Sequence, residues 1–262
     1  MILNTVGRGA NSIRKNPAGK RIAILINNNQ YHKGAEDEEK LPDVKTGAQQ
    51  FHQLLKERYG YEMLTETILG DWALENKNNL MRILQGLLQK WSDREGHGGG
   101  EVDRLLLHYH GHGKEVLGHS CLLTPKGDAI PMVEVINKVT DYVKADRYYI
   151  IKDCCANKDE LANEADKKRV EEAVLEKQNE KLKEKIVKIE AVPGGYEAHA
   201  IKTCTYALVS VLNSSYDAGE EGVPLKALRE RLHKEHTNVE SRNYPGVESS
   251  IISEVVDDFF PL

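Results

Sequence analysis

Two short segments of this chain carry the residue types of a nucleophile and a base. Segment 108–113 has the sequence HYHGHG and segment 153–155 has the sequence DCC, which places His112 43 positions before Cys155. A thiol attacks a carbonyl carbon as the thiolate, so a nucleophilic cysteine needs a nearby imidazole to take its proton, and that imidazole can come from a distant point of the chain. The two segments therefore indicate covalent catalysis by a cysteine with a histidine as its base.

The chain around these segments has the alternating pattern of an α/β protein. Apolar runs predict strands at 21–27, 61–67, 102–108 and 147–152, and amphipathic patterns predict helices at 47–59, 73–91 and 132–143. Strands and helices in this order imply right-handed crossovers and a mostly parallel sheet covered on both faces, which is a three-layer αβα sandwich.

The two candidate residues directly follow two of these strands. The ligand site of such a sheet forms just beyond the carboxyl ends of its strands. His112 follows the run that ends at His108, and Cys155 follows the run that ends at Lys152. The topology therefore predicts that the imidazole and the thiol meet at one rim of the sheet.

The composition is typical of a soluble globular protein. Of the 262 residues, 40% are hydrophobic and 29% are charged, and the net charge of −5 argues against binding to nucleic acid or to anionic membranes. Residues 1–20 are polar and lack the apolar core of a signal peptide, and no later run approaches the about 18 apolar residues of a membrane span, so we expect a cytoplasmic protein. The four cysteines include no CxxC pair, so reduced thiols are expected.

The composition changes after the candidate nucleophile. Segment 158–190 is more than half charged and contains no Gly or Pro. One interpretation is a solvated helix or a mobile linker. The other is an excisable or regulatory segment between two subdomains, in which the basic run 167–169 and several later lysines would suit a protease that cuts after basic residues. Beyond it, the sequence predicts a strand at 186–192 and helices at 197–213 and 224–236.

These motifs resemble those of the caspase-like cysteine peptidases, and within that clan the metacaspases and paracaspases more than the Asp-cutting caspases. Segment 27–31 (NNNQY) looks like the end of the family's IGINxY opening, 109–113 (YHGHG) looks like its YxGHG box, and 153–155 is similar to DxC. Segment 245–262 looks like the closing segment, so the likeness extends from about Arg21 to the end of the chain.

The resemblance implies a role for each matching residue. His112 would be the general base and Cys155 the nucleophile, with Cys154 as its buried or bystander neighbour. The backbone N–H groups of Gly113 and Cys155 would form the oxyanion hole, since a glycine lets the main chain approach the tetrahedral oxygen closely. His110 occupies a position that is usually a small residue.

The resemblance also implies specificity for a basic P1 residue. Metacaspases and paracaspases place an Asp where this chain has Asp153, and a buried carboxylate there can pair bidentately with a guanidinium and repel an acidic side chain. Glu197 resembles a second acid of the paracaspase pocket. One position departs from the pattern, because the helix after the first loop usually begins with an acidic residue before Ala, whereas this chain has Gly47 before Ala48.

The organisation of the chain follows from the same likeness. It implies a caspase-like fold in which the mostly parallel central sheet has about six strands. One caspase-like domain would comprise an N-terminal polar extension (1–20), a part like the large caspase subunit with the His/Cys site (21–157), a charged helical linker (158–185) and a part like the small subunit (186–262).

The implied protein is a cysteine endopeptidase that acts on proteins or peptides and is activated by cleavage or movement of the charged segment. No metal or other cofactor is required for this chemistry. Activation by Ca²⁺, which some metacaspases need, has no supporting EF-hand spacing in this sequence. The working form would be a monomer, as metacaspases generally are, or a homodimer paired through the last strand, as in caspases.

Three alternatives are compatible with the sequence. Imidazole suits Zn²⁺ and alternate residues of a strand face the same side, so the histidines could be zinc ligands. The residues in question are His108, His110, His112 and His119. The chain could also be a catalytically silent caspase-fold interaction module, in which the two boxes are structural relics. Finally, it could be a protease that cleaves after Asp, against which Asp153 and Glu197 argue.

Overall fold

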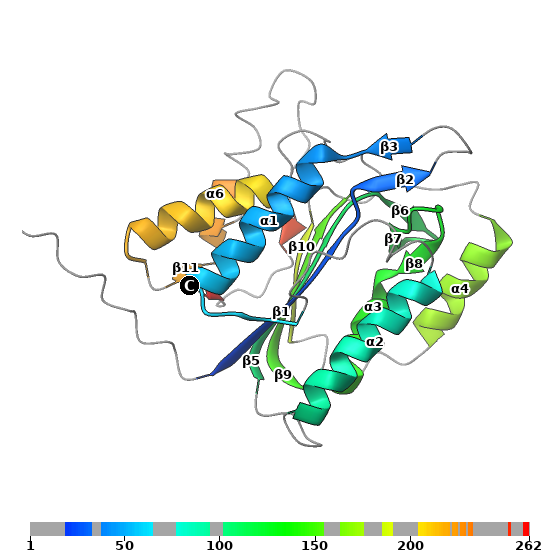
Figure 1. Cartoon of the computed structure of the whole chain (residues 1–262), viewed down its shortest axis with the longest axis horizontal. Helices are drawn as coiled ribbons and strands as arrows, with labels where there is room; N and C mark the ends of the chain where they lie inside the picture. Colours follow the sequence, from blue (N-terminus) through cyan, green and yellow to red (C-terminus); the bar gives the residue numbers. More distant parts are fainter. Residues whose placement is uncertain are drawn as a thin grey trace, which may run out of the picture.

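The computed structural model places a six-stranded sheet at the centre of the molecule (Figure 1). The structure describes residues 19–32, 38–64, 77–94, 102–154, 163–175, 185–190, 204–220, 222–224, 226–228, 230–232, 251–252 and 259–261. The strand order across the sheet is β12-β10-β9-β5-β1-β4. Their bounds are β1 Lys20–Asn27, β4 Glu62–Met63, β5 Val102–His110, β9 Ala145–Asp153, β10 Ile186–Glu190 and β12 Ile251–Ile252. Five strands are parallel and β12 is antiparallel to β10, as the sequence pattern predicts.

Helices cover both faces of this sheet. On one face lie α1 (Pro42–Glu57) and α6 (Cys204–Asp217), and on the other lie α2 (Lys77–Arg94) and α3 (Met132–Tyr142) (Figure 1). Successive residues of a strand point to opposite faces, so the central strands need apolar residues at every position. In β1, for example, Leu25 packs in the cluster with α1 and α6, whereas Ile24 packs in the cluster with α2 and α3. The predicted three-layer αβα sandwich is confirmed.

The register of the parallel strands aligns three polar residues at their carboxyl ends. Asn27 of β1 pairs with His110 of β5, and His110 pairs with Asp153 of β9. The ladder continues one step further, because the N–H of Asn28 donates to the carbonyl of His110 at 2.9 Å and the N–H of Gly111 donates to the carbonyl of Asp153 at 3.2 Å. All three side chains are buried and form a polar row at the rim of the sheet.

A small antiparallel sheet follows this rim directly. It consists of β6 (Gly113–Val116), β7 (His119–Leu123) and β8 (Ala129–Pro131), none of which the sequence pattern predicted. Its strands are only three to five residues long, and the turn between β6 and β7 is made by Leu117 (φ 50°) and Gly118 (φ 76°). Two positive φ angles are characteristic of a tight hairpin turn, whose usual first residue is Asn or Asp rather than Leu. The turn therefore lacked its usual sequence signal.

Part of the charged segment forms helix α4 (Glu164–Leu175), which packs on the small sheet. Val170 and Ala173 are buried, and Val170 lies in one apolar cluster with Val116 and Ala129 of that sheet. Residues 164–175 thus form a helix whose residues are mostly exposed, as expected of a solvated helix, but its inner side is packed on the small sheet, so this stretch is not a mobile linker.

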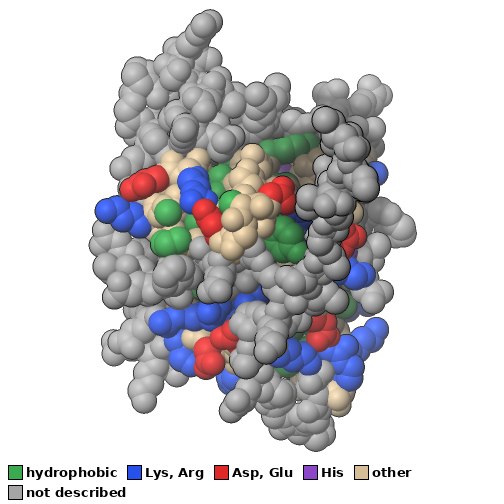
Figure 2. All heavy atoms as spheres, turned by 90° about the vertical axis from the view of Figure 1, so that its left-hand side faces the viewer, with side chains coloured by type: hydrophobic (Ala, Val, Ile, Leu, Met, Phe, Trp, Pro, Cys, Tyr) green, Lys and Arg blue, Asp and Glu red, His purple; other side chains and the backbone are tan. Residues whose placement is uncertain are grey.

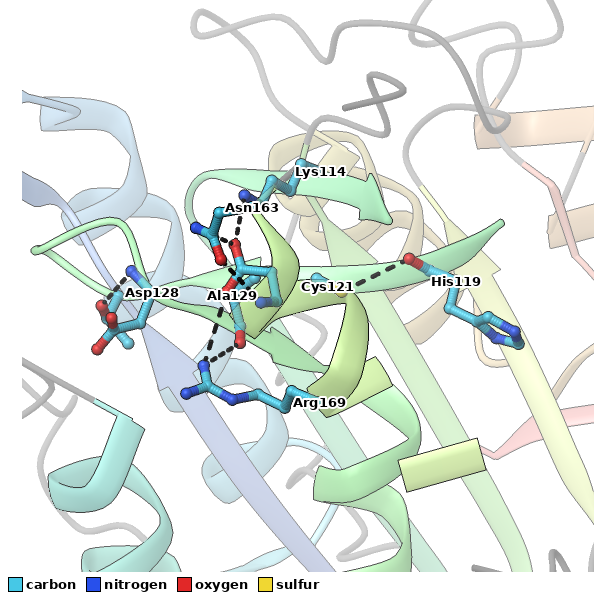
Figure 3. A network of polar contacts seen from close by, with 9 residues as sticks. Lys114, His119, Cys121, Asp128, Ala129, Asn163 and Arg169 are labelled. Carbon is cyan, nitrogen blue, oxygen red and sulfur yellow. Dashed lines mark hydrogen bonds and ion pairs between the residues drawn. The ribbon is translucent and has the colours of Figure 1, made fainter. Parts of the chain in front are cut away.

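Polar contacts also fix α4 to the sheet, as Figure 3 shows. Asp166 is 5% exposed, and its carboxylate accepts hydrogen bonds from Lys114 of β6 at 3.0 Å and from Asn163 at 3.3 Å. The Asn163 side chain in turn accepts the N–H of Asp166 at 2.8 Å, which caps the helix N-terminus. Arg169 donates to the carbonyl of Ala129 at 2.8 Å.

The remaining differences from prediction concern element boundaries and short strands. The strand expected at 61–67 is described only as β4, and the one expected at 186–192 as β10. The helix expected at 197–213 is described from Cys204 onward. In the helix expected at 224–236, residues 226–228 and 230–232 are helical, whereas Pro224 is the last residue of strand β11 (Gly222–Pro224). Further short pairs are β2 (Gln30–His32) with β3 (Glu38–Lys40), and β11 with β13 (Phe259–Pro261).

The surface carries charges of both signs. On the left-hand side of Figure 1, which faces the viewer in Figure 2, described Lys and Arg side chains lie beside described Asp and Glu side chains. Within the part of the chain that the structure describes, no helix combines the length and the apolar character needed to cross a membrane.

Candidate active site

The loop that carries His112 leaves β5 through a glycine that nothing larger could replace without movement. An ideal Cβ on Gly111 would lie 2.5 Å from the hydroxyl of Tyr31 and 2.9 Å from the hydroxyl of Tyr109. It would also lie 2.9 Å from the carbonyl oxygen of Asn28. The φ angle of Gly111 is +157°, which side chains rarely adopt. The main chain can therefore approach these groups only because residue 111 has no side chain.

Two buried tyrosines hold the backbone of His112. The His112 N–H donates to the hydroxyl of Tyr31 at 2.6 Å, and the hydroxyl of Tyr109 donates to the His112 carbonyl at 2.5 Å. That carbonyl also accepts the N–H of Leu123 at 3.0 Å. Burial raises the pKa of both tyrosines above the ordinary value, so both phenols are neutral hydrogen-bonding groups.

The imidazole of His112 is packed on one side. Its ring centroid lies 4.3 Å from that of Tyr31, with the planes tilted by 55°. The residue is half-buried, so part of it faces solvent. Tyr31 therefore fixes both the main chain and one face of the ring of His112, which reduces the freedom of the candidate base before any substrate binds.

Asp153 lies at the end of the neighbouring strand, in a fully enclosed position. Its side chain is 2% exposed, and its Oδ2 accepts hydrogen bonds from the N–H and from the hydroxyl of Thr205, both at 2.7 Å. The Nε2 of His110 lies 3.3 Å from the same oxygen. Thr205 is the second residue of α6, so the carboxylate also lies where the positive end of the helix dipole favours an anion.

The carboxyl group of Asp153 is ionised despite its burial. Burial alone would raise its pKa, but the neighbouring His110 and the two hydrogen bonds from Thr205 together outweigh that effect, so the pKa of Asp153 lies below the ordinary value of 3.8. The site therefore holds a negative charge at neutral pH, stabilised by the donors of Thr205 and by the nearby His110.

His108 completes a chain of buried polar contacts. Its Nε2 lies 2.9 Å from the hydroxyl oxygen of Thr205, whose single proton is already donated to Asp153. Nε2 must therefore carry the proton in this contact, and burial, followed by the neighbouring His110, lowers the pKa of His108 to about 3. His108 is thus a neutral donor at the strand end, packed against Phe51 of α1 with ring centroids 5.0 Å apart.

The start of α1 faces this polar group from the other side. An ideal Cβ on Gly47 would lie 3.3 Å from the ring of Tyr206 and 3.6 Å from the Cε1 of His110. The position at which the chain departs from the expected acidic residue therefore lies directly beside His110. Among the described residues, no three His, Cys, Asp or Glu side chains are grouped so as to hold a metal ion, which does not support the zinc interpretation of the histidines.

Several expected site residues are only partly covered by the structure. Gly113 is buried and begins β6, where it pairs with Leu122. Cys154 is buried and packs in the cluster on the α2 and α3 face, opposite to the face that holds Asp153. Cys155 and Glu197 lie outside the described residues.

Two contributors to this site were not predicted from the sequence. Thr205 was only part of an expected apolar helix, although a threonine near the start of a helix is a common capping position. His110 was noted for its unusual size and was otherwise considered only as a possible zinc ligand. Its signal was the repeat of His108 and His110 at a spacing of two, which places both rings on one face of β5.

Comparisons with known proteins agree with this architecture. A family profile described as Caspase domain matches residues 20–255. The structure is similar to Caspase-1 from Spodoptera frugiperda, with a TM-score of 0.59 and 12% identity over 100% of this chain and 97% of that one. It is also similar to protein GSU0716 from Geobacter sulfurreducens, with a TM-score of 0.54 and 15% identity over 92% of both chains. No curated protein sequence gives a significant match.

The family profile spans most of the chain. The two solved structures have the same fold as this chain, and at 12% and 15% identity they indicate the fold alone. The strand order, the helices on both faces and the His and Asp boxes at the ends of β5 and β9 fit the same assignment. The chain therefore belongs to the caspase-domain family of peptidases.

Proposed function

We propose that this protein is a cysteine endopeptidase in which His112 is the general base and Cys155 the nucleophile. The supporting observation is the register between β5 and β9, which pairs His110 with Asp153. Each candidate residue follows its paired strand residue by two positions. The chain therefore leaves two adjacent parallel strands at the same level immediately before the base and the nucleophile.

The proposed reaction follows the general scheme of thiol proteases. His112 takes the proton of Cys155, and the thiolate attacks the scissile carbonyl carbon to form a tetrahedral intermediate. The N–H groups of Gly113 and Cys155 would stabilise the oxyanion. His112 then gives its proton to the leaving amine, and water attacks the acyl-enzyme to release the acid and the free thiol.

A basic P1 residue is the specificity that the charges favour. The ionised Asp153 supplies a negative charge next to the proposed nucleophile, and Glu197 would add a second one. An acidic P1 side chain would be repelled by both groups. The substrates would accordingly be proteins or peptides cut after Arg or Lys.

The charged segment is the proposed site of activation. A protease binds its substrate in extended form, whereas the basic residues Lys167 to Arg169 are part of the packed helix α4. Cleavage is therefore expected outside α4, and the basic residues between α4 and β10 are Lys177, Lys181, Lys183 and Lys185. Sequencing of the new N-terminus of an autoprocessed sample would test this assignment.

The test of the proposed function is the turnover of matched fluorogenic peptides that end in Arg, Lys or Asp, with and without Ca²⁺. Wild type should cleave the basic peptides, and Cys155→Ala should abolish the cleavage. Cys154→Ala is the matched control, because it removes the adjacent thiol on the opposite face and should retain activity. Cleavage of the Asp peptide alone would leave the nucleophile in place but reject the basic specificity.

Equal turnover by wild type and Cys155→Ala would reject the proposed nucleophile. If the folded wild type, before and after proteolytic cleavage of the charged segment, cleaves no peptide, the proposed enzymatic function is wrong. A catalytically silent interaction module would then be the better description.

A further inference from the structure

The carboxylate of Asp153 is enclosed, and one of its two oxygens already has several polar neighbours. The two hydrogen bonds from Thr205 and the contact with His110 all involve Oδ2. The side chain is 2% exposed. A P1 guanidinium or ammonium group that is to pair with this carboxylate must therefore reach an enclosed group whose Oδ2 already has other polar partners.

His110 is the group that a P1 side chain would have to displace. Its side chain is also 2% exposed, and its Nε2 faces Oδ2 of Asp153 at 3.3 Å. At this distance the imidazole and the carboxylate form an ion pair when the imidazole is protonated. The imidazole thus takes the position and the role that a basic substrate group would have.

Gly47 of α1 has no side chain, which leaves room for the ring of His110. The Cε1 of His110 would be 3.6 Å from a Cβ on Gly47, and the ring of Tyr206 would be 3.3 Å from it. A longer side chain at position 47 would therefore enter the volume filled by these two rings. Position 47, which departs from the family pattern, and position 110, where a small residue is usual, are therefore neighbours in the fold.

We propose that His110 is a specificity-determining residue that competes with a basic P1 side chain for Asp153. The inference rests on the proposed peptidase function and deepens it. In the wild type, part of the binding free energy of an Arg or Lys side chain is used to displace the imidazole. Thr205 is a fixed part of the site, because it also anchors α6, whereas His110 can be replaced without leaving the carboxylate unbonded.

The first experiment compares His110→Ser with wild type on peptides that end in Arg, Lys or norleucine. Removing the competing imidazole should raise kcat/KM for the basic peptides by roughly tenfold, which corresponds to about 1.4 kcal/mol. The gain should appear mainly as a lower KM, and the norleucine peptide should change by less than about twofold. An equal change for basic and uncharged peptides, or a loss for the basic ones, would overturn the proposal.

A second variant separates occupancy from charge. His110→Asn keeps an N–H donor of smaller size and without ionisation, so its kcat/KM for the Arg peptide should lie between those of wild type and His110→Ser. This variant also tests the proposal if His110→Ser fails to fold. An increase in kcat/KM of His110→Asn for the Arg peptide, relative to that for the norleucine peptide, would support the competition, and no increase would contradict it.

A binding experiment makes the result independent of catalysis. Benzamidine is titrated into Cys155→Ala and into the double variant Cys155→Ala/His110→Ser, and its affinity is measured by calorimetry. The double variant should bind roughly tenfold more tightly if the imidazole no longer competes for Asp153. Adding Asp153→Asn should remove the gain.

The two experiments separate the peptidase function from the role of His110. Tighter benzamidine binding without peptide turnover by any variant would reject the peptidase function and support the competition at Asp153. Peptide turnover with identical benzamidine affinities would support the peptidase and reject the role of His110.

Discussion

The Asp153 carboxylate receives two hydrogen bonds of 2.7 Å from one residue, Thr205, which lies 52 positions later in the chain. The end of a central strand and the start of a covering helix are thereby joined at a single oxygen atom. Because the carboxylate is ionised and buried, this junction should be important for stability as well as for the charge of the site.

The hydroxyl of Thr205 is expected to make a measurable contribution to folding. Thr205→Val keeps the shape and the backbone N–H but removes the hydroxyl between Asp153 and His108, which leaves buried polar groups with fewer partners. We expect a loss of about 1–3 kcal/mol in the free energy of unfolding, measured by urea denaturation. Thr205→Ser should retain most of the stability, and Ser210→Ala on the exposed side of α6 should be neutral. A neutral Thr205→Val would contradict the assigned network.

The ionisation of Asp153 predicts a specific pH dependence. Its pKa is lower in the folded protein than the ordinary value of 3.8, so its ionisation stabilises the fold above that value and the contribution is lost as the pH falls through the folded pKa. The difference in unfolding free energy between wild type and Asp153→Asn should therefore be constant near neutral pH and shrink below about pH 4. A difference that stays unchanged down to about pH 3 would exclude this linkage.

Gly111→Ala should affect catalysis more than folding. The new methyl group would overlap the hydroxyls of Tyr31 and Tyr109, so the loop that carries His112 must shift. A displacement of about 1 Å at a catalytic group costs on the order of 100-fold in rate, which should appear in kcat/KM for the best peptide. Gly86→Ala is the matched control, because its Cβ would meet nothing within 4 Å and a helix gains about 0.5–1 kcal/mol from the exchange.

The packing of α4 can be tested by limited proteolysis. Val170→Ala removes two methyl groups from the cluster with Val116 and Ala129 and should cost about 1–3 kcal/mol locally. Trypsin should then cut more rapidly after Lys167, Lys168 or Arg169, at sites identified by mass spectrometry of the fragments. Val174→Ala on the same helix is the control, since Val174 is 40% exposed and its loss should leave the cleavage rate unchanged. Equal rates for the two variants would show that the buried contact does not hold the helix.

The central strands and their helices were predictable because burial on both faces leaves a strong sequence signal. The middle parts of β1, β5 and β9 are apolar (residues 22–26, 105–107 and 148–151), and each strand ends at a polar residue of the rim. The small sheet was not predictable, since its strands are short and its turn has Leu117 where Asn or Asp is usual.

The candidate site was predictable only as far as its motifs extend. The box residues placed His112 next to Tyr109 and Gly111, but neither spacing nor periodicity identifies Thr205 as the partner of Asp153. Such a contact depends on how α6 packs against β9, which is a property of the assembled fold. The position of His110 beside Gly47 likewise depends on how α1 packs against β5.

The ion pair between Lys114 and Asp166 acts as a cross-brace outside the main sheet. Lys114 lies two residues after His112, and Asp166 lies eleven residues after Cys155, so the chain passes from the base to the nucleophile and then returns to the strand that follows the base. The two halves of the proposed dyad are thus tied together twice, once by the β5–β9 ladder and once by this return contact. A cut or a bound protein that displaces α4 would therefore act on Lys114, which lies only two positions after His112.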